Sequence, residues 1–342
     1  MNFRVDRWSA VALRSSLVIL TTVSALLLSS CGGGGQSSQT KRFKPTRMIV
    51  FGDEASLLVP TTLGGNDSRK YTNNGLSATN TAVVDCLTAS RLWVQYLANE
   101  YELVFAECNP SNLTATAQMR ATAGAKVADL AAAVDAFLAT SAPVPTDLIT
   151  MMVGTNDLIE LYNGVMSSSL TQDAAVAEAR ARGLAFAGQI NRLINSNNTK
   201  GRVIYSTVPY LNLTPFGQST SNSDADRNLM RLLTQTFNDG MRAQEKDGGV
   251  KTNGRSLGFL DSAQKLRNIF DEVARGNEVD SITNVKQAAC SDPVNLLLCT
   301  NNTLVTGATS VNYLWAGNVN FSAAGHFYLG DDAVNLATSL PW

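Results

Sequence analysis

The sequence RMIVFGDEAS at residues 47–56 and the sequence DLITMMVGTND at residues 147–157 share one pattern. Each is an apolar run that ends at a glycine and continues into a group of polar residues. Short apolar runs of this kind are typical of strands buried in a parallel sheet. Ligands of such sheets bind beyond the carboxyl ends of the strands. We therefore expect the polar residues of the two stretches to meet at one edge of a sheet.

Strands and helices are expected to alternate along the chain. Two further buried strands are predicted at residues 202–208 and 256–260. This alternation predicts an α/β fold, a three-layer αβα sandwich with a mostly parallel central sheet. The composition does not change along this part of the chain, so we expect a single domain over residues 45–342. From the spacing of apolar residues, helices are predicted at residues 126–140, 173–194, 224–244 and 263–274 and from Ser322 onward.

The first 30 residues have the composition of a secretory signal peptide. Arginines precede an apolar run, residues 17–28, that is too short to span a bilayer. The small residues before Cys31 resemble the bacterial lipobox, whose cysteine is acylated; an ordinary cleaved signal peptide is the alternative. We expect a lipid on Cys31 and a flexible tether over residues 31–44. The protein is therefore expected to be anchored to the membrane at the cell envelope. Gly32 favours the outer membrane, facing the periplasm or the surface, because inner-membrane lipoproteins often carry an Asp there.

The charge balance and the cysteines narrow the range of functions. With a net charge of -1 and no basic cluster beyond residues 41–44, the chain is not expected to bind nucleic acid. The four cysteines besides Cys31 lie at no metal-ligand spacing, and we expect neither a metal nor another cofactor. Their even number in an exported chain suggests disulfides. Of the three possible pairings we expect the local one, which closes the shortest loops: Cys86–Cys108 and Cys290–Cys299. The second pair lies in an Asn- and Thr-rich segment, residues 285–313, that is expected to form an ordered excursion over the site.

The order and spacing of the polar groups resemble the sequence blocks of the SGNH, or GDSL, hydrolases, a family of esterases and lipases. The family's third block, Gly-x-Asn-Asp, is present as Gly154-Thr155-Asn156-Asp157, and its second-block glycine falls at Gly124. Residues 208–215 resemble the segment after the family's next strand, and residues 237–290 resemble its later half. The resemblance covers about residues 47–335. It implies the same αβα fold and an ester, lipid or glycan ligand in the cleft.

All three positions of the family's catalytic triad carry other residues in this sequence. The first block, Gly-Asp-Ser in the family, reads Gly52-Asp53-Glu54, so Glu54 replaces the nucleophilic serine. Aligning the sequence AAGH at residues 323–326 with the family's pattern puts the base at Asn320 and its acidic partner at Gly317. Serine ester hydrolysis needs a base within reach of the nucleophile and a group that orients the base. The resemblance therefore implies a divergent, catalytically impaired member. The residues expected in supporting roles are Asp53, Gly154 and Asp157.

The family's oxyanion hole implies a specific contact for Glu54. In the family the hole consists of the nucleophile's backbone N–H, the second-block glycine N–H and the third-block asparagine amide. The matching residues are Glu54, Gly124 and Asn156. Because such donors suit a negatively charged oxygen, we predict that the Glu54 carboxylate folds back and binds Gly124 and Asn156. The alternative is a Glu54 side chain that points into solvent beside a vestigial pocket.

Two other residues are candidates to replace the missing groups. Ser56 lies two residues beyond the nucleophile position, and such a shift in a tight turn points the side chain elsewhere. His326, the only histidine, lies six residues beyond the base position, about 9 Å further along a helix. We therefore expect His326 to pack in the protein or to make a cap contact, and we do not expect Ser56 to be the nucleophile. Glu54 as a nucleophile, or paired with Asp53 or Asp157 as in glycosidases, is a further alternative.

Two classes of function follow from these residues. The first is a catalytically silent envelope lipoprotein that binds a ligand or partner in the old active-site cleft. The second is an active esterase or lipase with an unorthodox nucleophile, acting on lipid or acylated-sugar esters. A structural spacer of the envelope is a third class. The substituted triad positions favour the first class.

Overall fold

The computed structural model describes residues 43–60, 68–195, 201–251 and 257–339. Within these ranges, five strands form a parallel sheet in the order β4-β1-β5-β6-β7. The predicted signal peptide and Cys31 lie outside the described residues, as does the tether up to residue 42. The predicted parallel sheet is confirmed. Its strands are β1 (Arg47–Gly52), β4 (Ala117–Met119), β5 (Asp147–Met152), β6 (Arg202–Ser206) and β7 (Leu257–Leu260).

Strand β1, which lies between β4 and β5, contributes to a hydrophobic core on each face of the sheet, because successive side chains of a strand point to opposite faces. Ile49 and Phe51 pack in one core. Met48 and Val50 pack in the other. The first core is completed by α3 (Val127–Thr140), α4 (Thr155–Met166), α5 (Gln172–Asn195) and α7 (Asp224–Met241). The second is completed by α2 (Trp93–Glu100), α8 (Ser262–Ala274) and α9 (Ala323–Ser339).

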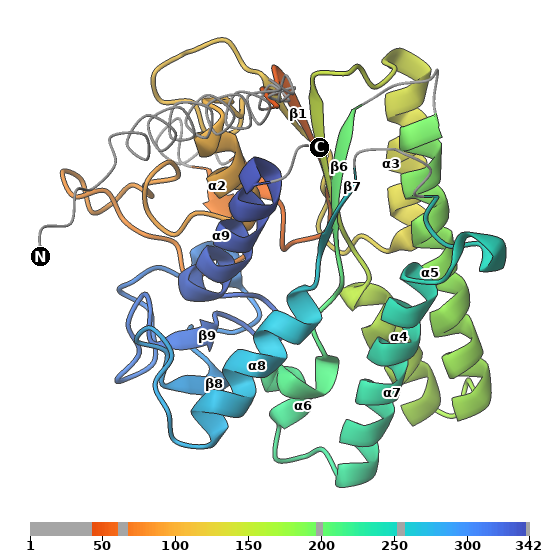
Figure 1. Cartoon of the computed structure of the whole chain (residues 1–342). Coiled ribbons are helices and arrows are strands. Elements are labelled where there is room, and N and C mark those ends of the chain that lie inside the picture. The colour runs from red at the N-terminus through yellow and green to blue at the C-terminus, as the bar shows by residue number, and fades with distance from the viewer. Residues whose placement is uncertain (1–42, 61–67, 196–200, 252–256, 340–342) are drawn as a thin grey trace, which may run out of the picture. The chain divides into compact units, whose positions relative to one another are not determined.

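Figure 1 shows these two groups of helices on either side of the strands. The predicted three-layer αβα sandwich is therefore confirmed. The helices α2 and α4 are not predicted by the sequence pattern. The helix predicted at residues 224–244 ends at Met241, since the chain turns there into the short 3-10 helix η3 (Glu245–Asp247) and Gly248 follows at a φ of 89°.

Strands β1 and β5 pair along their whole length, from Arg47 opposite Asp147 to Gly52 opposite Met152. Both strands consequently end at the same level of the sheet. Strand β4 pairs with β1 on its other side. The segments that follow β4, β1 and β5 therefore lie next to one another, with the segment after β1 in the middle.

Two disulfides hold segments outside the sheet, and their predicted pairing is confirmed. Cys86 is bonded to Cys108 and Cys290 to Cys299, each with a Cα separation of 5.9 Å. No helix of the described part of the chain is long and apolar enough to cross a membrane. The smaller elements are β2 (Leu58–Val59), β3 (Arg69–Lys70), η2 (Leu211–Leu213), α6 (Pro215–Gln218), β8 (Asn284–Ala288), η4 (Leu296–Leu298) and β9 (Tyr313–Trp315).

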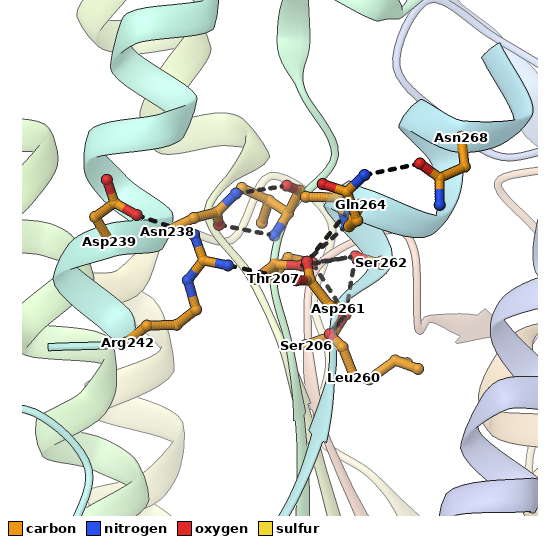
Figure 2. A network of polar contacts seen from close by, with 12 residues as sticks. Ser206, Thr207, Asn238, Asp239, Arg242, Leu260, Asp261, Ser262, Gln264 and Asn268 are labelled. Carbon is orange, nitrogen blue, oxygen red and sulfur yellow. Dashed lines mark hydrogen bonds and ion pairs between the residues drawn. The ribbon is translucent and has the colours of Figure 1, made fainter. Parts of the chain in front are cut away.

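A network of polar contacts joins the ends of β6 and β7 to α7 and α8 (Figure 2). Thr207, directly after β6, accepts a hydrogen bond at its Oγ1 from the Ala263 N–H of α8 at 2.9 Å. The buried Asn238 of α7 holds the backbone of Val208, with Nδ2 donating to the carbonyl at 3.0 Å and Oδ1 accepting from the N–H at 3.1 Å. Buried amide groups are stable only when paired in this way. The network therefore fixes Val208 where it packs against Gly154, the glycine after β5.

Candidate functional site

A tight turn after β1 carries two of the predicted site residues. Asp53 is 3% exposed, and its Oδ1 accepts a hydrogen bond from the Ala55 N–H at 3.0 Å. The Ser56 N–H donates to the Asp53 carbonyl oxygen, also at 3.0 Å. Asp side chains stabilise turns in this manner. The turn places Glu54 between the segments that follow the two neighbouring strands.

Gly154 after β5 cannot be replaced without strain. Its φ is 137°, a conformation that glycine adopts more readily than other residues. A Cβ atom there would lie 2.5 Å from Cζ of Phe237 and 3.2 Å from Cγ1 of Val208. The close approach lets α4 begin at once, so that Asn156 and Asp157 fall in its first turn. The predicted third block is thus a strand end followed directly by a helix start.

The Glu54 carboxylate binds the two donors that the sequence predicted for it. Its Oε1 accepts a hydrogen bond from the Gly124 N–H at 2.5 Å, and its Oε2 accepts one from Nδ2 of Asn156 at 3.0 Å. Gly124 follows β4 and Asn156 follows β5. The predicted contact is present, and the alternative in which Glu54 points into solvent is wrong. One side chain from the turn after β1 therefore joins the segments after both neighbouring strands, β4 and β5.

Asp157 and Asn156 hold the second-block segment in place. The Oδ2 of Asp157 accepts a hydrogen bond from the Val127 N–H, the first residue of α3, at 3.0 Å. Asn156 Nδ2 also donates to the Ala125 carbonyl oxygen at 3.1 Å. Arg182 of α5 donates to Oδ1 of Asp157 at 3.2 Å. Because these bonds fix the start of α3 against α4, they set the position of the Gly124 N–H that Glu54 binds.

Glu54 lies in a small pocket of about 140 Å³. Asn320, at the position of the family's base, lines the same pocket. Its carbonyl oxygen accepts hydrogen bonds from the Ala316 N–H at 2.9 Å and from the Gly317 N–H at 3.3 Å. The nucleophile and base positions are therefore brought together. The lining residues are Asp53, Glu54, Ala55, Tyr71, Met152, Thr155, Asn156, Val294, Val319, Asn320 and Phe321.

Gly317, at the position of the family's acidic residue, does not line this pocket. A Cβ atom at Gly317 would lie 2.6 Å from Cδ1 of Leu296 and 2.9 Å from the Pro293 carbonyl oxygen. Real Cβ atoms do not approach backbone atoms so closely. The disulfide-bonded loop between Cys290 and Cys299 therefore occupies the space that an acidic side chain at this position would need.

His326 and Ser56 are buried and are not bonded to each other. Both side chains are 0% exposed. Nδ1 of His326 accepts a hydrogen bond from the Trp93 N–H at 3.4 Å, and Nε2 finds no hydrogen-bond partner among the described residues. The Trp93 indole Nε1 donates to Oγ of Ser56 at 3.1 Å. Burial, and after it the positive charge of Lys70, lower the pKa of His326 to about 3. His326 is therefore packed inside the protein, and Ser56 is bonded to Trp93 and not to a base.

The protonation state of Asp53 differs from that of an ordinary carboxyl group. Burial, and after it the charges of Glu54 and Asp157, raise its pKa to about 8, while the Ala55 N–H opposes the shift. Asp53 is consequently protonated at neutral pH. Burial also raises the pKa of Asp157, although the Val127 N–H and Arg182 oppose this shift. Both supporting carboxyl groups therefore have a pKa above the ordinary value.

Tyr71 and Val294 are among the lining residues that have no predicted role. Tyr71 follows β3, in a segment whose pattern gives no sign of a site. Val294 lies in the segment that was expected to pass over the site, and the pocket lining shows that this segment does reach it. The predicted excursion over residues 285–313 was therefore the sequence signal that pointed to Val294. Nothing in the sequence alone marks Tyr71.

A larger cavity of about 500 Å³ lies elsewhere, between α2 and residues 103–113. None of the predicted catalytic or supporting residues lines it. The residues of the first and third blocks therefore line the smaller pocket and not this cavity. Among the residues that the structure describes, no group of three or more His, Cys, Asp or Glu side chains could hold a metal ion.

No protein-family model and no curated protein matches the chain. Among solved structures, an acetylxylan esterase from Geobacillus stearothermophilus is 15% identical, with 87% of this chain and 96% of that chain covered and a TM-score of 0.40. A member of the lipolytic G-D-S-L family from Veillonella parvula is 13% identical, with 85% and 97% covered and a TM-score of 0.39. An extracellular lipase from Streptomyces rimosus is 13% identical, with 85% and 99% covered and a TM-score of 0.42. These similar structures are esterases and lipases, the class that the sequence motifs resemble.

Proposed function

We propose that the protein is an envelope-anchored relative of ester hydrolases that does not hydrolyse esters and instead binds a ligand or partner in the old active-site cleft. The contact between the Glu54 carboxylate and the Gly124 and Asn156 donors carries this proposal. In an acyl-transfer enzyme, donors at this place stabilise the oxyanion that forms from the substrate. Here a carboxylate of the protein itself already occupies them.

Three further observations support the loss of serine chemistry. Glu54 provides no hydroxyl nucleophile, and the Asn320 side chain cannot accept a proton as a base does. The pKa of the only histidine lies at about 3, far from the neutral range in which a general base works well. Ser56 is buried and accepts a hydrogen bond from Trp93, so a substrate does not reach its hydroxyl group.

The alternative is an active esterase that uses Glu54 as its nucleophile. Attack of a carboxylate on an ester would form an anhydride, and a second step would need a base to activate water. The pocket holds no histidine, and its other carboxyl group, Asp53, is protonated at neutral pH. The first function therefore has the better support.

An ester-hydrolysis assay on the purified domain separates the two functions. With p-nitrophenyl acetate and butyrate, we expect the wild-type domain and Glu54→Ala to stay at the background rate. We expect the double variant E54S/N320H to gain at least about tenfold over the wild type, because it combines a hydroxyl nucleophile, a base and free donors. The matched control is E54S/N320Q, which has the nucleophile without the base.

One result would contradict the proposal. Wild-type hydrolysis that survives a second purification and disappears in Glu54→Ala or Ser56→Ala would establish an active enzyme.

The membrane anchor is a separate part of the proposal. The two disulfides support export, because such bonds form and persist outside the cytoplasm. We propose that Cys31 carries a lipid that holds the domain at the outer membrane. Cells fed an alkyne-tagged fatty acid should label the wild-type protein, and Cys31→Ser should lose both the label and the membrane association. A labelled Cys31→Ser protein would rule out this anchor.

A further inference from the structure

The pocket that contains Glu54 has an unusual balance of charge. Its lining includes two carboxyl groups, those of Asp53 and Glu54, and no Lys, Arg or His side chain. Because Asp53 is protonated at neutral pH, Glu54 is the one lining group left to carry a charge. The donors that would suit an anion, Gly124 N–H and the Asn156 amide, are already bonded to it. The pocket therefore repels anions and attracts cations.

Glu54 keeps capacity to bind a ligand. A carboxylate offers about four lone-pair positions, and the contacts with Gly124 and Asn156 use two of them. Tyr71 lines the same pocket, and its pKa is raised first by burial and then by the charge of Glu54. A group that enters the pocket therefore meets both a carboxylate and an aromatic ring.

The remaining lining is partly polar and partly apolar. Thr155 and Asn320 contribute polar groups. Phe321 is 2% exposed and stacks on Trp315, with ring centroids 5.4 Å apart, so its ring is held rigidly. Met152 and Val319 add apolar surface, and Val294 stands at the rim with 78% of its surface exposed. The apolar part of the lining suits methyl or methylene groups better than hydroxyl groups, which would lose their hydrogen bonds to water there.

The size of the pocket limits what it can hold. A volume of about 140 Å³ corresponds to roughly five water molecules at about 30 Å³ each. A trimethylammonium group has four heavy atoms and fits in this space, whereas a sugar ring with its hydroxyl groups is more than twice as large. The pocket thus fits one compact head group, with the rest of a ligand outside the rim at Val294.

We propose that this pocket binds a small alkylammonium head group, with Glu54 as its counter-ion and the rings of Tyr71 and Phe321 against its methyl or methylene groups. This inference rests on the proposed binding function and names its ligand class. Aromatic rings and a carboxylate together stabilise alkylammonium ions, because the faces of the rings carry partial negative charge and a methylated ammonium ion loses little hydration energy when it leaves water. A substitution at the nucleophile position has therefore changed the preference of the site from a negative oxygen to a positive head group.

The experiment compares two probes of the same shape with the purified wild-type domain. Choline carries a trimethylammonium group, and 3,3-dimethyl-1-butanol is its uncharged carbon analogue. Binding is followed by saturation-transfer difference NMR on the probe methyl groups and by calorimetry, at one fixed ionic strength. We expect choline to bind at least about tenfold more tightly than the alcohol. Acetate is expected to show no binding.

Two variants test whether the charge of Glu54 causes the preference for choline. Glu54→Gln keeps the shape of the side chain and removes its charge, and it should bring the affinities for choline and the alcohol within about threefold of each other. Glu245→Gln removes an exposed carboxylate from η3, away from the pocket, and should leave the preference for choline unchanged. Near-ultraviolet circular dichroism confirms that both variants are folded. The comparison of probes on the wild-type domain does not depend on either variant.

Equal affinities of the wild-type domain for both probes, or no binding of choline, would overturn the inference. A preference for choline that survives Glu54→Gln would overturn the role of Glu54. Neither result changes the conclusion that ester hydrolysis is lost, because hydrolysis is measured separately with p-nitrophenyl esters. Hydrolysis by the wild-type domain would instead refute the proposed function, whatever the result with choline.

Discussion

His326 is expected to remain uncharged at a pH where an ordinary histidine is protonated. Its imidazole is 0% exposed, lies edge-on against Phe321 and has no carboxylate partner. Its Nδ1 accepts a hydrogen bond from the Trp93 N–H, so the proton of the neutral ring is on Nε2. Protonating Nδ1 would break that bond and bury a charge close to Lys70. Burial and Lys70 therefore lower the pKa from its ordinary value of 6.5 to about 3.

The free energy of unfolding should fall in acid because of this residue. Between pH 6.5 and pH 3 the unfolded chain binds a proton at His326 and the folded chain does not, so lowering the pH favours unfolding. The stabilising effect is complete above pH 6.5 and is lost as the pH falls toward 3. The slope is about 1.4 kcal/mol per pH unit. Over the whole interval the loss is on the order of 5 kcal/mol.

A protein without an affinity tag gives one imidazole to follow, because the chain contains a single histidine. We expect its NMR signals to stay unchanged from pH 8 to pH 5. In urea unfolding, the wild type should lose about 2 kcal/mol more than His326→Asn between pH 7 and pH 5. The Asn oxygen replaces Nδ1 as an acceptor for Trp93 and cannot be protonated. A titration midpoint above pH 5, or equal pH dependence of the two proteins, would refute the reasoning.

Three further outcomes are expected. Asp53→Asn keeps the turn acceptor but cannot ionise. As the pH rises from 4 to 8, the unfolded wild type has released the Asp53 proton and the folded wild type still holds it, so the wild type should lose up to about 1.4 kcal/mol of unfolding free energy per pH unit. The variant should lose less, as urea unfolding at several pH values would reveal. Gly154→Ala should cost about 2–5 kcal/mol through the clash with Phe237 and the strained φ; thermal melting that matches the wild type would contradict this. Arg182→Met should cost about 1–3 kcal/mol, since it removes a donor from the buried Asp157, and an unchanged urea midpoint would show that the other donors suffice.

Much of the fold could be read from local patterns. The strands at residues 47–52 and 147–152 are mostly apolar because they are buried on both faces, and the glycines at 52 and 154 mark where they end. Helix α3 showed its apolar stripe, whose residues Val127, Leu130, Val134 and Phe137 are buried. Helix α2 was missed because it has eight residues, too few for a repeating pattern. Helix α4 was missed because it begins inside the third block, directly after Gly154.

The sequence by itself predicted the local pairing of four cysteines and, through the family resemblance, three substituted triad positions and a Glu54 carboxylate that faces donors suited to an anion. Those conclusions depend on residue identity and on order along the chain. Only the tertiary structure decided that Tyr71 and Val294 line the pocket with Glu54, and that Leu296 and Pro293 occupy the space beside Gly317. These contacts join residues far apart in the chain, and loop segments without periodic patterns provide them. Their positions follow from how the loops pack on the finished sheet, because no local pattern specifies which distant side chain fills a given space.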